Sequence, residues 1–313
     1  MIFMEFKFLK NQYDIESAFE VLEGIYSDRK VSLIEEYQDA YNFKVSLPDD
    51  FSWYVDPKIK EYSKMEILDM PISYKLQQNK NKVFLETYYH SNAIIAPIIL
   101  KNSSGIDIEC ILHFDDHSDM MPFYKPLNFD EKVPLEKLVQ QNVIGIGNFL
   151  TYYLTQINGI PTFHIQDKQS SSFGYINKRI KSYKQNYNIG DRVFEKINFA
   201  HDEIGSPYIK TEINSLPEIK YKNIWLDIDL DYFCNRYNRN SDWEESDYLN
   251  RDGEELQEVL SHFLNYLIQS SWFNEVRVVT IATSPGFFPL EYYNIAYKLL
   301  ILPLKERFLN DRF

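Results

Sequence analysis

The chain has 313 residues, 44% of them hydrophobic, which suits one large domain or two modest ones with a substantial core. Its 46 acidic and 33 basic side chains give a formal net charge of −13, which argues against a nucleic-acid or anionic-membrane surface and mildly favours a cationic partner. The only two cysteines, Cys110 and Cys234, exclude a disulfide scaffold and a cysteine-ligated zinc module. Because the sequence has neither a signal-peptide pattern nor an apolar stretch of about 18 residues, we expect a soluble cytoplasmic protein.

Residues 1–80 are expected to form an N-terminal helical cap or subdomain. Residues 14–27 carry apolar side chains at helical spacing, and residues 33–43 continue a mixed pattern. A turn signal follows at 48–50. The remainder, 81–313, is predicted to be a separate catalytic domain.

Short apolar runs rich in β-branched and aromatic residues begin at about residue 82. They occupy 82–89, 93–100, 107–114, 142–147, 222–230 and 276–283. Continuous apolar runs, as opposed to alternating ones, are typical of a parallel sheet covered on both faces. The predicted fold class is therefore α/β, with three layers, α/β/α, around a mainly parallel central sheet.

Two helices and one insertion complete the predicted domain. Residues 252–267 have an acidic start followed by an apolar stripe, which predicts an amphipathic helix. The C-terminal residues 291–309 predict a final helix that is broken near Pro303. Residues 165–222 are polar and are interpreted as a long surface insertion, with a flap that grips a substrate as the other interpretation.

The first candidate site follows the apolar run that ends at Phe114. Asp115, His117 and Asp119 form the pattern D-x-H-x-D, and His113 lies two residues before Asp115. In a doubly wound sheet, ligands bind at the carboxyl ends of the strands. These polar groups are therefore expected to face a crevice and not the core.

A second acidic strand end carries Asp227, Asp229 and Asp231. Alternation along an extended strand places all three on one side. A buried sheet tolerates such a row only if its charge is neutralised, and a metal ion would do this. An EF-hand calcium loop is rejected because Tyr232 and Asn238 occupy the positions that need glycine and glutamate.

Taken together, the two strand ends predict a binuclear metal site. Taken singly, either motif is equally well explained as a helix cap or a turn. Carboxylate oxygens with one or two imidazole nitrogens suit Mn²⁺ better than a thiolate zinc site would. Two Mn²⁺ ions would acidify a shared water and polarise the carbon of a substrate.

These motifs resemble those of the superfamily of arginase, agmatinase and the histone deacetylases. HFDDHSD is similar to the ureohydrolase motif D-x-H-x-D, LDID to the second motif, and YHSNAI to the segment that supplies the first metal histidine. The resemblance implies an arginase-like fold and implies that Asp119 and Asp227 bridge two ions, with Asp116 and Asp231 as neighbours. The implied metal ligands are His90, Asp115, His117, Asp119, Asp227 and Asp229.

The sequence is more similar still to a divergent branch of that superfamily. Five segments of that branch recur here in order, at 86–90, 113–119, 145–149, 226–233 and 284–287. Bacterial members of this branch include the peptide arginases that modify ribosomally made natural products (RiPPs). The resemblance implies that peptidyl-arginine in a precursor peptide is converted to peptidyl-ornithine, with release of urea. Such a peptide would be the partner of this chain, with no nucleic acid and no membrane.

The sequence departs from arginases at the substrate. Ala282 stands where arginases carry a glutamate that contacts the guanidinium, and the residues after Asp119 do not resemble the loop that holds a free amino acid. This loss argues for a peptide substrate. Candidates for binding the guanidinium are Asp116, Thr283, Ser284 and Glu291.

Asp119 is expected to be both a ligand and the acceptor that orients the attacking water, and His113 is the first candidate for the proton donor. His164 and His201 are the other candidates for this donor. Two alternative functions stay open. One is an amidohydrolase of the deacetylase type that uses zinc or manganese, and the other is a non-catalytic binding protein.

Overall fold

The computed structural model describes most of the chain, including all the candidate site residues. The described ranges are 3–25, 30–46, 74–126, 144–157, 159–170, 173–236, 249–284 and 287–310. The predicted turn at 48–50 and two residues of the 284–287 segment lie outside these ranges.

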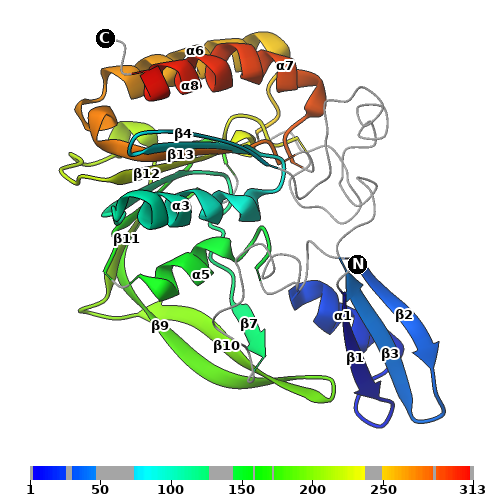
Figure 1. The fold of residues 1–313 in the computed structure, drawn as a ribbon. Coiled ribbons are helices and arrows are strands. Elements are labelled where there is room, and N and C mark those ends of the chain that lie inside the picture. Colours follow the sequence, from blue (N-terminus) through cyan, green and yellow to red (C-terminus); the bar gives the residue numbers. More distant parts are fainter. Residues whose placement is uncertain are drawn as a thin grey trace.

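A large central sheet of ten strands organises the described chain (Figure 1). Its middle six strands are parallel, and they are, in spatial order, β5 (Lys82–Thr87), β13 (Val276–Ala282), β12 (Ile224–Asp229), β6 (Cys110–Phe114), β8 (Thr162–Ile165) and β11 (Ser206–Thr211). Antiparallel strands extend it on both sides, with β4 (Tyr74–Asn79) beside β5, and β9 (Ile176–Ile189), β10 (Arg192–His201) and β7 (Phe123–Pro126) beyond β11. The prediction of an α/β fold with a large, mostly parallel sheet is confirmed.

Helices pack on both faces of this sheet. On one face, α3 (Ile95–Ser104) and α5 (Phe149–Gln156) pack against Leu85, Ile111, Trp225 and Val278 of the strands. On the other face lie α6 (Gly253–Gln269), α7 (Tyr293–Ala296) and α8 (Leu302–Asn310), against Leu112, Leu226, Ile228 and Val279. Every one of these eight strand residues is buried, which explains the apolar runs at 82–89, 107–114, 222–230 and 276–283. The run at 93–100 was wrongly grouped with them, because these residues are helical.

The two predicted helices near the C-terminus are present. Asp252 caps α6, and its side chain accepts hydrogen bonds from the backbone of Glu254 and Glu255 at 2.8 and 3.0 Å. The final helix is interrupted by a π-helical turn (Tyr297–Ile301) directly before α8. Pro303 is the second residue of α8, within a helical run that is continuous from Tyr293, and it donates no backbone hydrogen bond to the preceding turn. Short 3₁₀ helices, η3 to η7, occupy His90–Ile94, Ile213–Ser215, Leu230–Tyr232, Ser271–Glu275 and Leu290–Tyr292.

The N-terminal residues form a small antiparallel sheet with one helix, so the expectation of a helical cap is only partly right. The predicted helix is present as α1 (Ile15–Ile25), but β1 (Phe3–Leu9), β2 (Lys30–Glu36) and β3 (Ala40–Ser46) form a sheet in the order β1-β3-β2. The residues after α1 were misread because Phe43 and Val45 alternate inward over a short span and pack on Phe6 and Phe8. We call residues 3–46 the N-terminal unit. The large sheet already begins at Tyr74, with β4.

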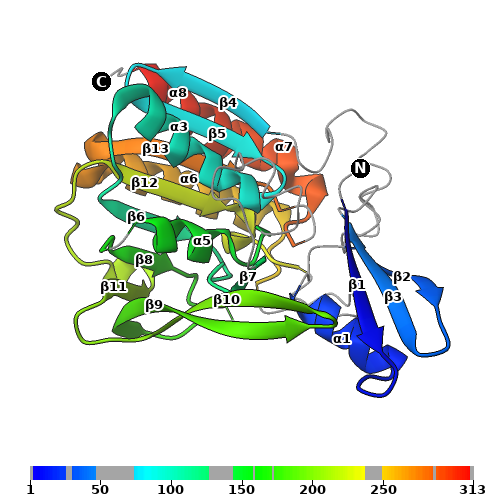
Figure 2. The ribbon, with the colours of Figure 1, turned by 60° about the horizontal axis from the view of Figure 1, so that its bottom comes forward.

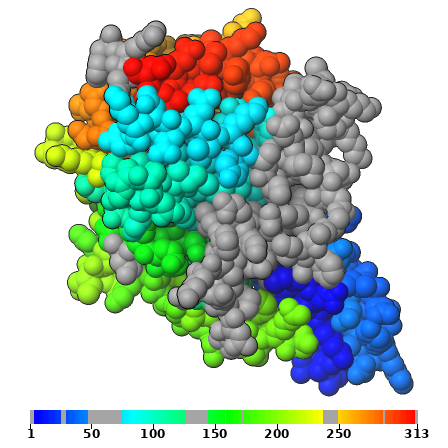
Figure 3. Space-filling model, viewed as in Figure 1, coloured from blue at the N-terminus to red at the C-terminus, as the bar shows by residue number. Residues whose placement is uncertain are grey.

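The predicted insertion at 165–222 contains β9, β10 and β11. Strands β9 and β10 form a long hairpin, which we call the arm, and its tip packs on the N-terminal unit (Figures 2 and 3). Ile189 and Phe194 of the arm share one core with residues of β1, β3 and α1. Gly190 at the turn has a φ of +59°, and a Cβ there would lie 2.4 Å from the Lys7 carbonyl oxygen. Glycine is therefore required at this contact.

Candidate metal centre

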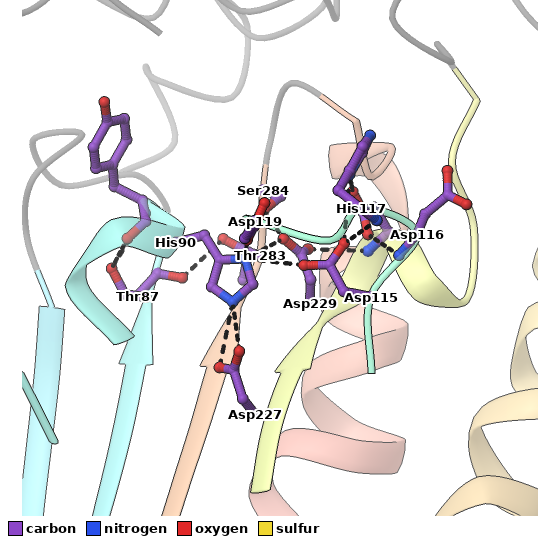
Figure 4. Close-up of polar contacts among 12 residues, drawn as sticks. Thr87, His90, Asp115, Asp116, His117, Asp119, Asp227, Asp229, Thr283 and Ser284 are labelled. Carbon is purple, nitrogen blue, oxygen red and sulfur yellow. Dashed lines mark hydrogen bonds and ion pairs between the residues drawn. The ribbon is translucent and has the colours of Figure 1, made fainter. Parts of the chain in front are cut away.

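Buried acidic and imidazole side chains meet at the carboxyl edge of the parallel strands. Pairing places Asp227 of β12 opposite His113 of β6 and opposite Thr280 of β13. Asp115 and Asp119 follow β6, and His90 begins η3, directly after β5. Figure 4 shows the side chains of His90, Asp115, Asp119 and Asp227 between the strand ends. The prediction that both acidic strand ends face one place is thus confirmed for the described residues.

His90 lies among four carboxylates. Its Nδ1 atom is 2.9 Å from Asp119 Oδ2 and 2.9 Å from Asp229 Oδ2. The same atom is 3.3 Å from Asp115 Oδ2. On the other side of the ring, Nε2 is 3.2 Å from Asp227 Oδ2. The imidazole therefore connects the two acidic strand ends.

His117 lies on the other side of Asp115. Its Nδ1 atom is 2.8 Å from Asp231 Oδ2 and 3.4 Å from Asp115 Oδ1. Its backbone N–H donates to Asp115 Oδ1 at 2.5 Å. Its Nε2 atom is buried and has no hydrogen-bond partner in the described part of the chain. Asp231 therefore contacts His117, a predicted ligand, directly. The resemblance implies only that Asp231 is a neighbour of the ligands.

His113 is fully buried beneath the cluster. Its Nδ1 lies 2.8 Å from Asp227 Oδ2, and its Nε2 lies 3.1 Å from the backbone oxygen of His117. Both ring nitrogens are therefore engaged inside the protein. This position suits a side chain that holds the two strand ends together.

The carboxylates raise the proton affinity of all three histidines. Burial opposes a charge on His113, but Asp115 and Asp227 outweigh it and raise the pKa of His113 to about 9. Burial is likewise outweighed at His90, whose pKa is raised well above its usual value by Asp227 and Asp229. The same balance, with Asp231 as the main charge, raises the pKa of His117. The cluster thus carries negative charge that attracts cations, whether protons or metal ions.

The pKa values of carboxyls in the cluster are also shifted, in opposite directions. Burial and the neighbouring charge of Asp115 raise the pKa of Asp119 to about 6. At Asp227, burial is outweighed by the charge of His90 and the hydrogen bond of His113, which lower its pKa to about 2. The two aspartates therefore differ in how readily they are protonated.

The donor set fits divalent metal ions. Ligand atoms of His90, His113 and Asp115 lie within 4.8 Å of one another, and so do those of Asp115, His117 and Asp231. The buried Oδ2 atoms of Asp115, Asp119 and Asp231 each lie close to an imidazole nitrogen of His90 or His117. A buried carboxylate needs a counter-charge, which either a protonated imidazole or a bound cation would supply. The buried His and Asp groups could therefore hold a metal ion, with Asp115 common to both groups.

A cavity of about 500 Å³ opens on the cluster. Its floor includes His90, His117, Asp119 and Asp229, which come from the strand ends. The other described lining residues are Gly24, Ser118, Met121, Ile146, Gly147, Ser284 and Phe287. The volume falls within the range of roughly 300–1,000 Å³ that ligand pockets usually have.

Two of the lining residues adopt a strained backbone. Asp119 has a φ of +47° and Ser284 has a φ of +37°. Residues other than glycine rarely adopt positive φ values, and such strain is concentrated at functional sites. The Ser284 hydroxyl donates to Asp229 Oδ2. The strained residues thus hold a carboxylate and a hydroxyl at the cavity.

Two candidates for guanidinium binding are engaged elsewhere. Asp116 is buried, and it accepts hydrogen bonds from Asn235 Nδ2 at 2.8 Å and from the Ser170 hydroxyl. Glu291 Oε1 is 2.5 Å from Arg236 Nη1. Neither Asp116 nor Glu291 belongs to the described cavity lining, whereas Ser284 does.

Ala282 is the last residue of β13, and Thr283, the remaining candidate for guanidinium binding, follows it. Ala282 is buried and pairs with Asp229 in the sheet, so a methyl group stands where the resemblance would place a glutamate. The backbone N–H of Thr283 donates to the Thr87 carbonyl at 2.9 Å. Thr283 therefore links β13 to the end of β5 and does not belong to the described lining.

Of the other histidines, His164 supports the cluster and His201 does not. His164 Nε2 lies 3.0 Å from the Asp115 carbonyl, and its Nδ1 lies 3.0 Å from the Tyr208 hydroxyl. Burial and the charge of His113 lower the pKa of His164 to about 3, so the ring is neutral and donates from Nε2 to Asp115. His201 is exposed at the end of the arm strand β10.

Sequence reasoning missed Thr280 as a member of the site. Its hydroxyl donates to Asp227 Oδ1 at 2.5 Å and accepts from Trp225 Nε1 at 2.7 Å. The signal was a polar residue within the apolar run 276–283, whose partner only the strand pairing reveals.

Comparison of the sequence with protein-family models and with curated protein sequences finds no match. Within the described ranges, no helix is both long and apolar enough to cross a membrane. The geometry of the site is therefore the basis for any functional conclusion.

Proposed function

We propose that this chain is a metal-dependent hydrolase with two Mn²⁺ ions, and that it converts peptidyl-arginine to peptidyl-ornithine and urea in a RiPP precursor. The observation that carries the proposal is the pair of ligand groups that meet on Asp115 beneath a cavity. Helices on both faces of a parallel sheet support the finer assignment of a three-layer, arginase-like fold. The order of the five sequence segments adds the peptide arginase branch.

Metal ions would be held by the residues that surround His90 and His117. On the first side these are His90, Asp119 and Asp229, with Asp227 at the other ring nitrogen of His90. On the second side they are His117 and Asp231, and Asp115 contacts both histidines. When bound, such ions lower the pKa of water and polarise the carbon under attack. Oxygen and imidazole ligands without thiolate favour Mn²⁺ over structural zinc.

The residues that face the cavity would position the reactants. The Asp119 carboxylate lies at the cavity and can accept a hydrogen bond from the attacking water, which orients it. Guanidinium N–H groups need acceptors, and the Ser284 hydroxyl and the Asp229 carboxylate supply them. The side chains of Met121, Ile146 and Phe287 offer an apolar wall for the aliphatic stem of an arginine.

The lining also supports a peptide over a free amino acid. No lysine or arginine occurs among the described lining residues, so nothing there would pair with a free α-carboxylate. The main chain of a peptide is neutral and needs no such partner. The floor, by contrast, is acidic and suits a cationic side chain.

The alternative of a deacetylase-type amidohydrolase is less well supported by the same cavity. Deacetylase relatives aim a tyrosine at the substrate carbonyl, and no tyrosine occurs among the described lining residues. A non-catalytic binding protein would have no need for strained backbone at both Asp119 and Ser284.

The test is to incubate the manganese-loaded protein with an arginine-containing peptide, free arginine, agmatine and an acetyl-lysine peptide in parallel. We expect urea and ornithine from the arginine peptide, and two manganese ions per chain by elemental analysis. Acetate release with one zinc per chain would favour the amidohydrolase. If none of the substrates gave a product, the remaining hypothesis would be a non-catalytic binding protein.

A matched pair of variants tests the assigned role of Asp119. Asn tolerates positive φ, so Asp119→Asn keeps the backbone at φ +47° while removing the charge, and it should reduce urea release by about 10²-fold or more. Asp107→Asn is the control, because Asp107 is 58% exposed and pairs only with Lys101 among the described residues. Wild-type urea release by Asp119→Asn would show that the assignment is wrong.

A further inference from the structure

The N-terminal unit contributes Gly24 to the cavity. Gly24 lies in α1 and is the only described lining residue from that unit, while the floor comes from the ends of parallel strands. The arm makes this possible, because its tip shares a core with the unit and holds it beside the cavity. The Lys7 backbone N–H also donates to Asp191 Oδ1 at 3.3 Å across this contact.

Neither backbone conformation nor packing calls for glycine at position 24. Its φ is not in the left-handed region, unlike those of Gly105, Gly159 and Gly190. A Cβ at Gly24 would meet no atom within 4 Å in the described chain. Glycine inside a helix is destabilising relative to alanine, because the unfolded glycine backbone has more freedom to lose. Gly24 is the next-to-last residue of α1, and among the described residues its missing side chain leaves space beside the helix.

The space beside Gly24 is not needed to hold the guanidinium group itself. The polar atoms that could act on a guanidinium lie on the floor, at Asp119, Asp229 and Ser284. Whatever is bound to those atoms extends away from them through the cavity, whose described lining includes Gly24 of the N-terminal unit. Absence of a side chain lets another backbone approach closely.

We propose that Gly24 is a specificity-determining residue, and that the space above it receives the main chain of a peptide whose arginine side chain reaches the floor. The inference rests on the proposed function for the identity of the ligand. It adds that the N-terminal unit is part of the substrate site. Free arginine lacks the flanking main chain and leaves this space empty.

Side-chain replacements at position 24 provide the kinetic test. Gly24→Phe should raise KM for an arginine octapeptide by about tenfold, with a small change for N-acetylarginine amide, because the lost binding concerns the flanking chain. Gly24→Ala should raise the thermal midpoint of the protein. Glu20→Phe is the control, since Glu20 is exposed on the same helix and does not belong to the described lining. Equal KM changes for both substrates would overturn the proposal.

A thiol at position 24 gives a readout that does not depend on turnover. Both native cysteines are buried, so alkylation of the Gly24→Cys protein reports on the introduced thiol. At about ten times its Kd, the octapeptide should slow alkylation about tenfold, because about one site in eleven remains free. Free arginine at the same occupancy should leave the rate unchanged, and Glu20→Cys should not be protected by either ligand.

The outcomes separate this inference from the proposed function. Protection of the introduced thiol without urea release would overturn the hydrolase proposal and retain Gly24 as a peptide contact. Urea release without protection would do the reverse. Equal protection by free arginine would show that Gly24 does not distinguish a peptide from an amino acid.

Discussion

Six buried aspartates meet at the carboxyl edge of the parallel strands, whereas the core shared by the N-terminal unit and the arm consists of aromatic and aliphatic side chains such as Phe6, Phe43 and Phe194. The edge is unfavourable without a counter-charge, because desolvation opposes each ionised carboxylate. The arm core is favourable by itself, because it removes apolar surface from water. The acidic edge therefore needs a counter-charge, which a metal ion could supply, whereas the core of the arm is stable by itself and holds the N-terminal unit beside the cavity.

The largest effect is expected from replacing Asp115, the residue common to both ligand groups. Asp115→Asn should abolish manganese binding and bring urea release below about 10⁻³ of the wild-type rate, since a metal ion contributes several kcal/mol to such a reaction. Isothermal titration with Mn²⁺ and the urea assay check this, with Asp107→Asn as the control. Retained binding of two ions would refute the assignment of the edge as a metal site.

The arm core should respond in stability and not in chemistry. Phe43→Ala removes a fully buried ring and should lower the free energy of unfolding by about 3–5 kcal/mol, measured by urea denaturation. Tyr37→Ala, at a residue that is 43% exposed, should change it by less than about 0.5 kcal/mol. Manganese affinity of the folded Phe43→Ala protein should match that of the wild type. A weakened manganese affinity would mean that the two regions are coupled.

The metal-free edge should make stability depend on pH in a defined direction. The pKa of His113 is about 9 in the folded protein against an ordinary value of 6.5, so its proton stabilises the fold fully below pH 6.5. This contribution of roughly 3 kcal/mol is lost as the pH rises through about 9. The raised pKa of Asp119 also makes the stability fall with rising pH, but over a lower range, from its ordinary value of 3.8 to about 6.

Manganese should reverse that dependence, because His and Asp ligands must lose their protons before they bind a metal ion. Urea denaturation in EDTA and in Mn²⁺, at pH 6.5 and at about pH 9, measures both slopes. A fall in stability with rising pH in both conditions would show that the edge is a permanent network of charged histidines and aspartates.

The smallest expected effect comes from beneath the edge. His164→Leu leaves the Asp115 carbonyl without its donor and should weaken manganese binding by about 10–100-fold, as the loss of an outer hydrogen bond usually does. His262→Leu, at an exposed residue of α6, is the control. Unchanged binding in His164→Leu would confine the metal-binding role to residues at the cavity floor.

The parallel sheet and its acidic edge could be predicted because their signals are local. Apolar runs that end in aspartate mark β6 and β12 directly, and alternation places Asp227 and Asp229 on one side. The N-terminal sheet was missed because Phe43 and Val45 alternate over too short a span to outweigh a mixed pattern. Contacts between distant strands, such as that of Thr280 with Asp227, depend on register, which the sequence does not encode locally.

The approach of Asp231 to His117 illustrates the same limit. An extended strand would keep Asp231 in line with Asp227 and Asp229, but the 3₁₀ turn at Leu230–Tyr232 redirects it. Its backbone N–H donates to Asp229 Oδ1 at 3.1 Å, which fixes the turn. The sequence therefore predicted that Asp231 belongs to the acidic strand end, but it did not predict the direction of its side chain.

In the proposed function, the parallel strands supply the chemistry, and the N-terminal unit that the arm supports supplies the selectivity. The parallel strands carry the acidic floor, and a hairpin that adds only antiparallel strands to the sheet carries the wall with Gly24. Substitutions in α1 can reshape that wall without disturbing any strand that contributes to the floor. A lineage with this architecture could exchange one peptide for another through changes in a single short helix, while its reaction stays the same.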